Sequence, residues 1–399
     1  MDNYDVAVIG GGPTGATAAN DLALAGKRVL LLDRDGRIKP CGGAVPPILV
    51  REFDIPESLL EAKVTTARMI SPENVKVDMP VGGWVGMVNR STFDEWLRER
   101  AASNGATRAT GKFLKVVRDD ETSPIVEFKD SEGQTQRIRA KAIIGADGAV
   151  SNVAKQCLAD QGVLPNVFAY HEIVRSPAAN DEVKAAETAG DFDPERCDVY
   201  YQGSCSPDFY GWVFPHGEET SVGMGTAVQG FSLRGSVSLL RENAGLTNAE
   251  TVRTEGAPIP LKTRKRWDNG RDVVVSGDAA GAVAPASGEG IYYAMISGRC
   301  AAQAVEEFLV TGKPKALKLA RKRFMKMHGR VFFILGIMQK FWYSSDKRRE
   351  RFVSICKDPD VQVLTWEAYM NKKLVKAKPV AHIRIFFKDM AHLLGLAPR

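Results

Sequence analysis

Three glycines near the start of the chain have the spacing of a turn that holds a dinucleotide. Gly10, Gly12 and Gly15 come directly after the apolar residues 6–9, and a helical pattern begins at Thr14. In such a turn the first glycine permits a tight bend, the second lets the backbone approach a pyrophosphate, and the third lets the helix pack closely on the strand. The free N–H groups at the start of the helix would face the phosphates. The alternative is a glycine turn that binds nothing.

An acidic residue at a suitable distance supports the ligand-binding interpretation. A second apolar run ends at Asp33, about 20 residues beyond the glycines, where a carboxylate accepts a hydrogen bond from a ribose 2′-hydroxyl. The same negative charge would repel the 2′-phosphate of NADP. The first motif is therefore compatible with NAD or FAD and disfavours a tightly held NADP.

A second glycine-rich turn, much later in the chain, distinguishes FAD from NAD. The apolar residues 273–275 lead to Asp278, and Gly288, Gly290 and Ile291 open another helical pattern. A carboxylate there can accept a hydrogen bond from a ribityl hydroxyl, and N–H groups beside the glycines can reach the pyrimidine edge of an isoalloxazine ring. That edge gains negative charge on reduction, which a helix N-terminus stabilises. Two such turns predict FAD; a purely structural strand–turn–helix is the alternative for the second.

Two further residues are weaker candidates for cofactor contacts. Asp147 follows the apolar residues 142–145 and forms an Asp-Gly turn with Gly148, which many proteins use without a ligand. Arg90 precedes an amphipathic helical pattern, and a solvated arginine at a helix start is the alternative.

The elements that must position these residues follow from the hydrophobic periodicity. The pattern predicts strand–helix–strand for residues 5–33, an irregular loop for 37–47 and strands of a second layer for 64–88. A helix capped by Ser91 or Thr92 is expected next. It is followed by a β-meander for 113–141, with turns at 119–121 and 130–133, and by a further strand for 142–145. Residues 165–265 are rich in strands and aromatic side chains. A strand at 273–275 and a helix at 288–299 return to the first domain, and helical periods dominate beyond residue 313.

The predicted fold class is α/β with a mixed α+β second layer. A chain of 399 residues is long enough for two domains. We expect a Rossmann-like FAD-binding domain of residues 1–65, 86–160 and 268–312, interleaved with a sheet-based substrate domain of residues 66–85 and 161–267. Residues 313–399 are expected to form a basic C-terminal helical region.

Composition bears on location and partners. The six cysteines show no metal-ligand spacing, so no metal site is expected and a reducing cytoplasm is indicated. The chain shows no secretory signal and no apolar run of about 18 residues. Nucleic acid binding is not expected, because no nucleic-acid-binding module accompanies the positive charge. The oligomeric state is not predicted.

The positive charge is concentrated at the C-terminal end. The net charge is +6, yet residues 311–399 hold 21 Lys and Arg against 6 Asp and Glu. Basic residues alternate with apolar and aromatic ones in 321–343 and again in 372–388. This pattern predicts peripheral contact with an anionic membrane. The alternative is a helical cap whose charges are solvated.

The motifs together resemble a known superfamily of flavoproteins. The GxGxxG turn, the run Arg90-x-x-Phe-Asp-x-x-Leu97, the Gly-Ala-Asp-Gly turn ending at Gly148 and the Gly-Asp-Ala-Ala-Gly run around Asp278 are similar to those of the p-hydroxybenzoate-hydroxylase-like FAD superfamily. Within it, the chain resembles the geranylgeranyl reductases in Pro40-Cys-Gly-Gly-Ala44, in Tyr210-Gly-Trp-Val-Phe-Pro215 and in residues 288–298. Residues 358–373 resemble the branch that serves chlorophyll and bacteriochlorophyll synthesis. The resemblance spans nearly the whole chain.

The resemblance implies a reaction and a set of contacts. Hydride passes from NADPH to FAD, and all but one of the double bonds of a geranylgeranyl chain are saturated to give a phytyl chain, on the diphosphate or on (bacterio)chlorophyllide. No second GxGxxG motif is present for NADPH, so the nicotinamide is expected to bind only transiently. The additional cofactor contacts that the resemblance implies are Arg34, Cys41, Gly42, Gly43 and Ala44.

The same resemblance identifies candidates for catalysis and substrate binding. An isolated alkene has no electron sink, so hydride transfer needs a proton donor. Cys41 and Tyr210 are the catalytic candidates, although Cys41 could merely shape a pocket. Tyr210, Trp212 and Phe214 share one face of a strand at two-residue spacing, and with Pro215 they would line a prenyl tunnel or else fill a core. His216 is a further proton donor to consider, but a histidine just past a strand is usually structural.

Two other functions use the same fold. A flavin monooxygenase or halogenase would share the cofactor motifs, but halogenases carry Trp-x-Trp-x-Ile-Pro where this chain has residues 210–215. A non-enzymatic prenyl carrier would not need intact glycine turns at both ends. The basic run 262–266 could hold a diphosphate or could be a solvated strand end.

Overall fold

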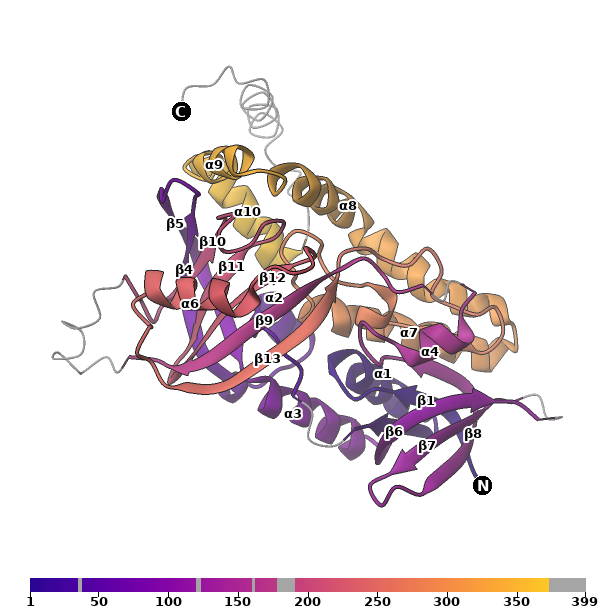
Figure 1. The fold of residues 1–399 in the computed structure, drawn as a ribbon. Helices are drawn as coiled ribbons and strands as arrows, with labels where there is room; N and C mark the ends of the chain where they lie inside the picture. Colours follow the sequence, from indigo (N-terminus) through magenta and orange to yellow (C-terminus); the bar gives the residue numbers. More distant parts are fainter. Residues whose placement is uncertain (35–37, 120–122, 160–161, 178–190, 373–399) are drawn as a thin grey trace. The chain divides into compact units, whose positions relative to one another are not determined.

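A computed structural model describes residues 1–34, 38–119, 123–159, 162–177 and 191–372 of the chain (Figure 1). The chain forms two compact units that alternate along the sequence. The first unit consists of Met1–Lys39, Arg90–Asn166 and Pro258–Phe333, and the second of Pro40–Asn89, Val167–Ala257 and Ile334–Arg399. Residues 40–65 thus group with the second unit, whereas the sequence placed them in the FAD-binding domain. The reason is strand pairing, since Ala44 lies opposite Met87 in the second unit's sheet.

The first unit is built on a parallel sheet. Its strands β1 (Asp2–Ile9), β2 (Val29–Asp33), β6 (Thr107–Val117), β8 (Thr135–Gly145) and β14 (Val273–Val275) lie in the order β6–β2–β1–β8–β14. The apolar runs that predicted β1, β2 and β14 are buried, as expected for strands covered on both faces. The predicted Rossmann-like arrangement is therefore confirmed.

A meander extends this sheet. Strand β7 (Ile125–Asp130) pairs antiparallel with the second half of β6 and the first half of β8. The predicted turn at 130–133 is confirmed, since the Asp130 carboxylate accepts hydrogen bonds from the N–H groups of Glu132 and Gln134 at 3.0 and 2.8 Å. The prediction of a separate strand at 142–145 is wrong. These residues are the end of β8, which pairs with β7 at its start and with β1 toward its end. The other predicted turn includes residues 120 and 121, which lie outside the described residues.

Helices α1 (Pro13–Leu24), α3 (Arg90–Ser103) and α7 (Ile291–Thr311) belong to the first unit. A Cβ atom at Gly298 of α7 would lie 2.3 Å from the carbonyl oxygen of Thr14, so α7 packs directly on α1. The predicted cap of α3 is wrong, because the helix begins at Arg90 and includes Ser91 and Thr92. The buried Arg90 guanidinium binds both carboxylate oxygens of Asp94, at 2.7 and 2.6 Å, which stabilises that first turn.

The second unit is built on a mostly antiparallel sheet, which has eight strands among the described residues. In spatial order these are β13 (Thr251–Pro260), β9 (Asn166–Arg175), β12 (Glu219–Thr226), β11 (Gly211–His216), β10 (Arg196–Tyr200), β4 (Leu60–Ile70), β5 (Lys76–Val88) and β3 (Ala44–Val45). The strands predicted for 64–88 and 165–265 are present. The short strand β3 lies inside the loop predicted for residues 37–47, and the short helix α2 (Pro47–Glu52) follows it in a stretch for which the sequence predicted no element.

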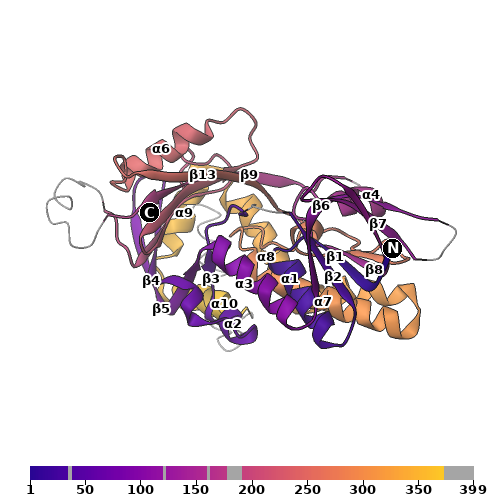
Figure 2. The ribbon, with the colours of Figure 1, turned by 90° about the horizontal axis from the view of Figure 1, so that it is seen from below.

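A helix that the sequence did not predict covers one face of this sheet. Helix α6 (Leu233–Asn243) lies on the face of the sheet formed by β11 and β12 (Figure 2). Its residues Val237 and Leu240 pack in one buried cluster with Val213 of β11 and Val222 of β12. Side chains alternate along a strand, so the neighbouring residues of β11 face the opposite side of the sheet.

The described part of the C-terminal region is helical, as predicted. It contains α8 (Leu319–Trp342), α9 (Asp346–Ile355) and α10 (Pro359–Asn371). Arg349 of α9 is 1% exposed and donates hydrogen bonds to the carbonyl oxygens of Pro207 and Tyr343. Residues 373–399, with most of the second basic cluster, lie outside the described residues. None of the described helices has the length and apolar character needed to cross a membrane.

Candidate functional site

The glycine turn leaves room for a ligand only at its middle position. Gly10 has a φ of +106°, and a Cβ atom there would lie 2.3 Å from the Ala146 carbonyl oxygen. A Cβ atom at Gly15 would lie 1.8 Å from the carbonyl oxygen of Gly10. At Gly12 a Cβ atom would meet no atom within 4 Å, although this residue caps the N-terminus of α1. The turn therefore presents open space and a helix N-terminus, which fits a pyrophosphate.

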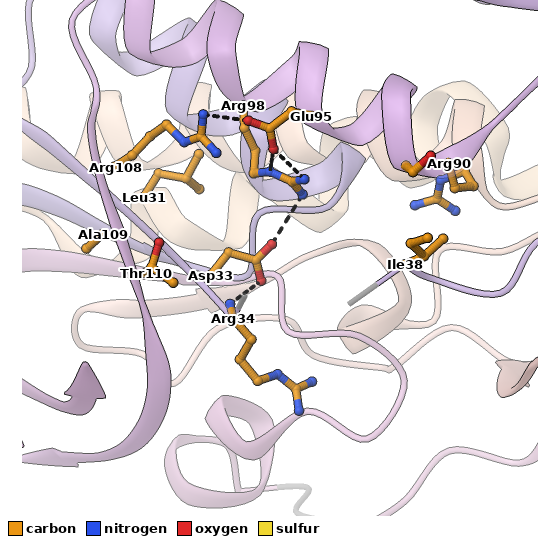
Figure 3. Close-up of a pocket in the computed structure, with 11 residues that line it drawn as sticks. Leu31, Asp33, Arg34, Ile38, Arg90, Glu95, Arg98, Arg108, Ala109 and Thr110 are labelled. Carbon is orange, nitrogen blue, oxygen red and sulfur yellow. Dashed lines mark hydrogen bonds and ion pairs between the residues drawn. The ribbon is translucent and has the colours of Figure 1, made fainter. Parts of the chain in front are cut away.

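A cavity of about 360 Å³ adjoins the end of β2 (Figure 3). This is within the range of small-molecule sites, roughly 300–1,000 Å³. Strand β2 and the residue after it, helix α3 and strand β6 contribute side chains to its walls, among them Leu31, Asp33, Arg34, Arg90, Arg98 and Thr110. The predicted ribose partner Asp33 and the predicted contacts Arg34 and Arg90 thus line one cavity.

Arg98 connects the parts of this cavity. Its guanidinium lies 3.4 Å from the Asp33 carboxylate and donates a hydrogen bond to the carbonyl oxygen of Gly11 at 3.2 Å. It also binds Glu95, which binds Arg108 at 2.8 Å. The hydrogen bonds from Arg108 and Arg98 lower the pKa of Glu95. No motif in the sequence identifies Arg98. Its spacing of four residues from Asp94 places the two side chains on the same face of α3.

Asp278 lies beside the glycine turn. It belongs to the 3₁₀ helix η2 (Gly277–Ala280) and forms an ion pair with Lys39. A Cβ atom at Gly277 would lie 2.1 Å from the hydroxyl oxygen of Thr14, so η2 touches the start of α1. The Asp278 side chain is 8% exposed and that of Lys39 is 38% exposed. The structure therefore brings the two predicted glycine motifs together, and adds a lysine that the sequence did not identify.

The start of α7 presents a helix N-terminus, which can stabilise negative charge on a ligand. The helix begins at Ile291, three residues after the predicted start, with Gly290 as the N-cap. Gly288 has a φ of +63° and closes the preceding loop through a hydrogen bond to Ala284. The hydroxyl of Ser297 accepts a hydrogen bond from the N–H of Gly277 at 3.0 Å, which fixes α7 against η2.

Asp147 has a structural partner. Its carboxylate accepts hydrogen bonds from the N–H groups of Asn152 and Val153, at 2.7 and 3.1 Å, and from the Ser151 hydroxyl. It thus closes the N-terminus of α4 (Asn152–Cys157). Burial raises the pKa of Asp147 even though these hydrogen bonds oppose the shift. The arrangement favours the structural alternative for its side chain, and the neighbouring backbone of Ala146 is what meets the glycine turn.

In the second unit, the loop Cys41–Gly43 lies over the face of β11 that is opposite α6. A Cβ atom at Gly42 would lie 3.1 Å from the Phe214 ring, and one at Gly43 would lie 2.4 Å from Nε2 of His216. Gly43 has a φ of +72°, and its N–H group donates to the sulfur of Cys41 at 3.4 Å. Ala44 then enters strand β3. Two motifs far apart in the sequence, residues 40–44 and 210–215, thus meet.

His216 is not suited to donate a proton. Its Nδ1–H group donates to the carbonyl oxygen of Phe214 at 2.9 Å. Burial lowers the pKa of His216 to about 4, so the ring is neutral near pH 7. The structural alternative for this histidine is the one that the geometry supports.

Aromatic rings form a row along this face of β11, and the first of them, Tyr210, lies one residue before the strand. The ring centroids of Tyr210 and Trp212 are 6.0 Å apart, and those of Trp212 and Phe214 are 6.3 Å apart. The shared face expected from the two-residue spacing is therefore present. Pro215 alternates with these residues and lies on the opposite face of the sheet.

Comparisons with known proteins agree with this geometry. A family model described as pyridine nucleotide-disulphide oxidoreductase matches residues 4–186. A Rhodobacter capsulatus protein named geranylgeranyl diphosphate reductase is 55% identical over 396 residues, which cover 99% of this chain and 98% of the relative. The chain belongs to the geranylgeranyl diphosphate reductase family. A chloroplastic member from Nicotiana tabacum is 35% identical, over 98% of this chain and 86% of its own.

Solved structures of other proteins share the fold of this member of the geranylgeranyl diphosphate reductase family. A geranylgeranyl bacteriochlorophyll reductase-like protein from Thermoplasma acidophilum aligns with a TM-score of 0.80 at 23% identity, covering 96% of this chain and all of that one. The flavin-dependent brominase Bmp2 aligns with a TM-score of 0.73 at 17% identity, covering 97% and 99%. The chain therefore shares the fold of these two proteins, the second of which is flavin-dependent by its name.

Proposed function

We propose that this protein uses FAD and NADPH to reduce the isolated double bonds of a geranylgeranyl chain to a phytyl chain in (bacterio)chlorophyll synthesis. The observation that carries the proposal is the row of rings at Tyr210, Trp212 and Phe214 beneath the Cys41–Gly43 loop. A long apolar face with a thiol loop above one end suits a branched hydrocarbon chain. The two relatives, one of them chloroplastic, are named for the reduction of geranylgeranyl diphosphate.

Residues of the first unit would hold the cofactor. The N-terminus of α1 at Gly12 would bind the pyrophosphate, and Asp33 with Arg34 and Arg98 would bind the adenosine half. Asp278 would accept a hydrogen bond from a ribityl hydroxyl, and the N-terminus of α7 at Ile291 would stabilise negative charge on the ring. Bound FAD supplies the hydride. Since Asp33 repels a 2′-phosphate, NADPH would bind elsewhere and only transiently.

Residues of the second unit would supply the proton and the substrate surface. Cys41 is half-buried, and its sulfur accepts a hydrogen bond from Gly43, so its S–H group can donate to another partner. Tyr210 is the second candidate donor, because it lies at the other end of the ring row. Trp212 and Phe214 would contact the isoprenoid chain, whereas Pro215 would act by shaping the strand.

An apolar stripe on α8 supports contact with a membrane. Met327, Phe333 and Ile337 are 52%, 70% and 53% exposed, and the helical spacing puts them on one side, next to Lys326 and Arg330. Exposed apolar residues flanked by cations fit an anionic lipid surface. Co-sedimentation with phosphatidylglycerol vesicles tests this, and the double substitution Phe333→Ser with Ile337→Ser is expected to abolish it.

The function is tested by anaerobic turnover. The purified protein is incubated with NADPH and either geranylgeranyl diphosphate or geranylgeranylated bacteriochlorophyllide, and the mass of the chain is followed. Stepwise gain of two hydrogens is expected, and the reactive substrate distinguishes diphosphate from pigment ester. Turnover that needs oxygen and leaves the chain unsaturated would instead support the monooxygenase or halogenase alternative.

A further inference from the structure

A chain of buried hydrogen bonds in the second unit ends at the indole of Trp212. The indole N–H lies 3.1 Å from the hydroxyl oxygen of Ser221, that oxygen lies 2.9 Å from Nδ1 of His171, and Nε2 of His171 lies 3.0 Å from the Glu255 carboxylate. Ser221 and His171 are 0% and 2% exposed. Most buried polar groups in proteins are hydrogen-bonded, and here each group is satisfied by the next.

The donors in this chain can be ordered from one end. An indole N–H can only donate, so the Ser221 oxygen accepts it; in the neutral His171 tautomer that carries its hydrogen on Nε2, Nδ1 accepts the hydrogen of the Ser221 hydroxyl. An ionised carboxylate can only accept, so Nε2 of His171 carries a hydrogen and donates it to Glu255. Each member has one assigned role, and the whole chain points from Trp212 toward the carboxylate.

The strand register shows that the site is built for an indole. His171 of β9 lies directly opposite Gly223 of β12, which lies directly opposite Trp212 of β11. A Cβ atom at Gly223 would lie 2.4 Å from the indole and 2.5 Å from the His171 side chain. The missing side chain at Gly223 lets the two rings meet above β12, with centroids 6.3 Å apart.

The far end of the chain is anchored by charge. Arg253 donates to the other oxygen of Glu255 at 3.0 Å and also binds Glu219 at 3.1 Å. Burial favours the protonated form of Glu255, but the hydrogen bonds from His171 and Arg253 outweigh it and lower the pKa of this carboxyl group. Glu255 therefore stays ionised and fixes the orientation of the imidazole.

We infer that His171 and Ser221 are positioning residues that hold the Trp212 indole as a rigid wall for the isoprenoid chain. The inference rests on the proposed function, in which Trp212 contacts the substrate. A geranylgeranyl chain repeats the same five-carbon unit, so sliding by one unit offers a nearly identical fit. A mobile indole would blur the position of the double bond, and misplacement by about 1 Å can cost a hundredfold in rate. Trp212 also neighbours Phe214, the ring beneath Gly42.

Two substitutions of His171 separate hydrogen bonding from packing. In His171→Asn the amide oxygen can occupy the place of Nδ1 and still accept from Ser221, whereas in His171→Gln the amide nitrogen can occupy the place of Nε2 and only the Glu255 bond survives. With ¹⁵N-labelled indole, the Trp212 N–H resonance, assigned by its loss in Trp212→Phe, is expected to stay in place in His171→Asn. It is expected to shift or broaden in His171→Gln and in Ser221→Ala.

Steady-state kinetics give the functional readout. His171→Gln and Ser221→Ala are expected to raise KM for the prenyl substrate by about 5- to 10-fold, the equivalent of one lost buried hydrogen bond, and to release partly reduced chains. The rate of flavin reduction by NADPH is expected to stay unchanged. Thr220→Val is the matched control, because Thr220 is equally buried on β12 but bonds Ser176 on the other face.

Two results would overturn the inference. Equal indole shifts in His171→Asn and His171→Gln would show that only packing matters. A displaced indole with unchanged KM and unchanged products would show that its position does not serve the substrate. Failure of the proposed function is distinguishable from both, because the unsubstituted protein would then reduce no prenyl chain while the indole resonances still report on His171.

Discussion

The guanidinium of Arg98 lies 3.4 Å from the carboxylate of Asp33, at the point where helix α3 reaches the end of strand β2. Because Arg98 also donates to the carbonyl oxygen of Gly11, one side chain joins the proposed ribose site to the glycine turn. Neither contact follows from local sequence, since the three residues come from separate elements.

Substitution of Arg98 should weaken the cofactor site. Arg98→Met removes the bonds to Asp33 and Gly11, so Asp33 is no longer held in place, and the dissociation constant of FAD is expected to rise about tenfold, as for one charged hydrogen bond. Quenching of flavin fluorescence on titration of the apoprotein measures this. Lys129→Met, an exposed position on β7, is the control; an affinity equal to the control's would contradict the role.

Asp278 is expected to contribute through its carboxylate. Asp278→Ala removes the proposed ribityl acceptor and also releases Lys39, so the FAD dissociation constant should rise by roughly 10- to 100-fold. Asp21→Ala removes an ion pair with Arg299 in the same unit and should leave FAD binding unchanged. Equal retention of FAD by the two variants would exclude Asp278 from the cofactor site.

The cofactor fold could be predicted because its signals are local. An apolar run, three glycines and an acid within about thirty residues specify a strand, a turn and a helix N-terminus, and the structure places Gly10, Gly12, Gly15 and Asp33 accordingly. The start of α3 was misplaced because the stabilising partner of Arg90 is a side chain four residues away, which outweighs the capping preference of Ser91 or Thr92.

The contacts that depend on strand pairing could not be predicted. The row His171, Gly223 and Trp212 exists only because β9, β12 and β11 lie side by side in one register. Helix α6 was not predicted, because its few apolar residues gain stability mainly by packing on the sheet. Likewise, the meeting of Gly43 with His216 depends on the path of a loop that has no periodicity.

Gly43 should not tolerate a side chain. Gly43→Ala imposes a positive φ on alanine and places its Cβ atom 2.4 Å from His216, so the free energy of unfolding is expected to fall by about 2 kcal/mol or more. Gly82→Ala is the matched control, because Gly82 also has a positive φ, of +69°, but a Cβ atom there would meet nothing within 4 Å. Urea unfolding of both variants measures the difference, and equal stabilities would disprove the close approach.

Substitution of Cys41 should slow the reduction of the alkene and leave the reduction of the flavin unchanged. Cys41→Ala removes the proposed proton donor, and loss of a general acid is expected to lower kcat by roughly 10²- to 10⁴-fold. Stopped-flow measurement of flavin reduction by NADPH should give the unsubstituted rate. Tyr210→Phe is the comparison, since it tests the second candidate donor while keeping the ring in the row. A Cys41→Ala enzyme with near-normal kcat would transfer the role to Tyr210.

His216 should make the second unit less stable at acidic pH. Its pKa is about 4 in the folded protein and about 6.5 in an unfolded chain, so the unfolded state binds the proton first. The contribution of neutral His216 to the free energy of unfolding is therefore fully present above pH 6.5 and is lost as the pH falls toward 4. Between pH 7 and pH 5 the loss is expected to be about 2 kcal/mol. His216→Asn keeps a donor for the Phe214 carbonyl but cannot titrate, so its urea unfolding free energy should fall less over the same interval. Identical pH profiles for both proteins would show that the imidazole is solvated in the folded state.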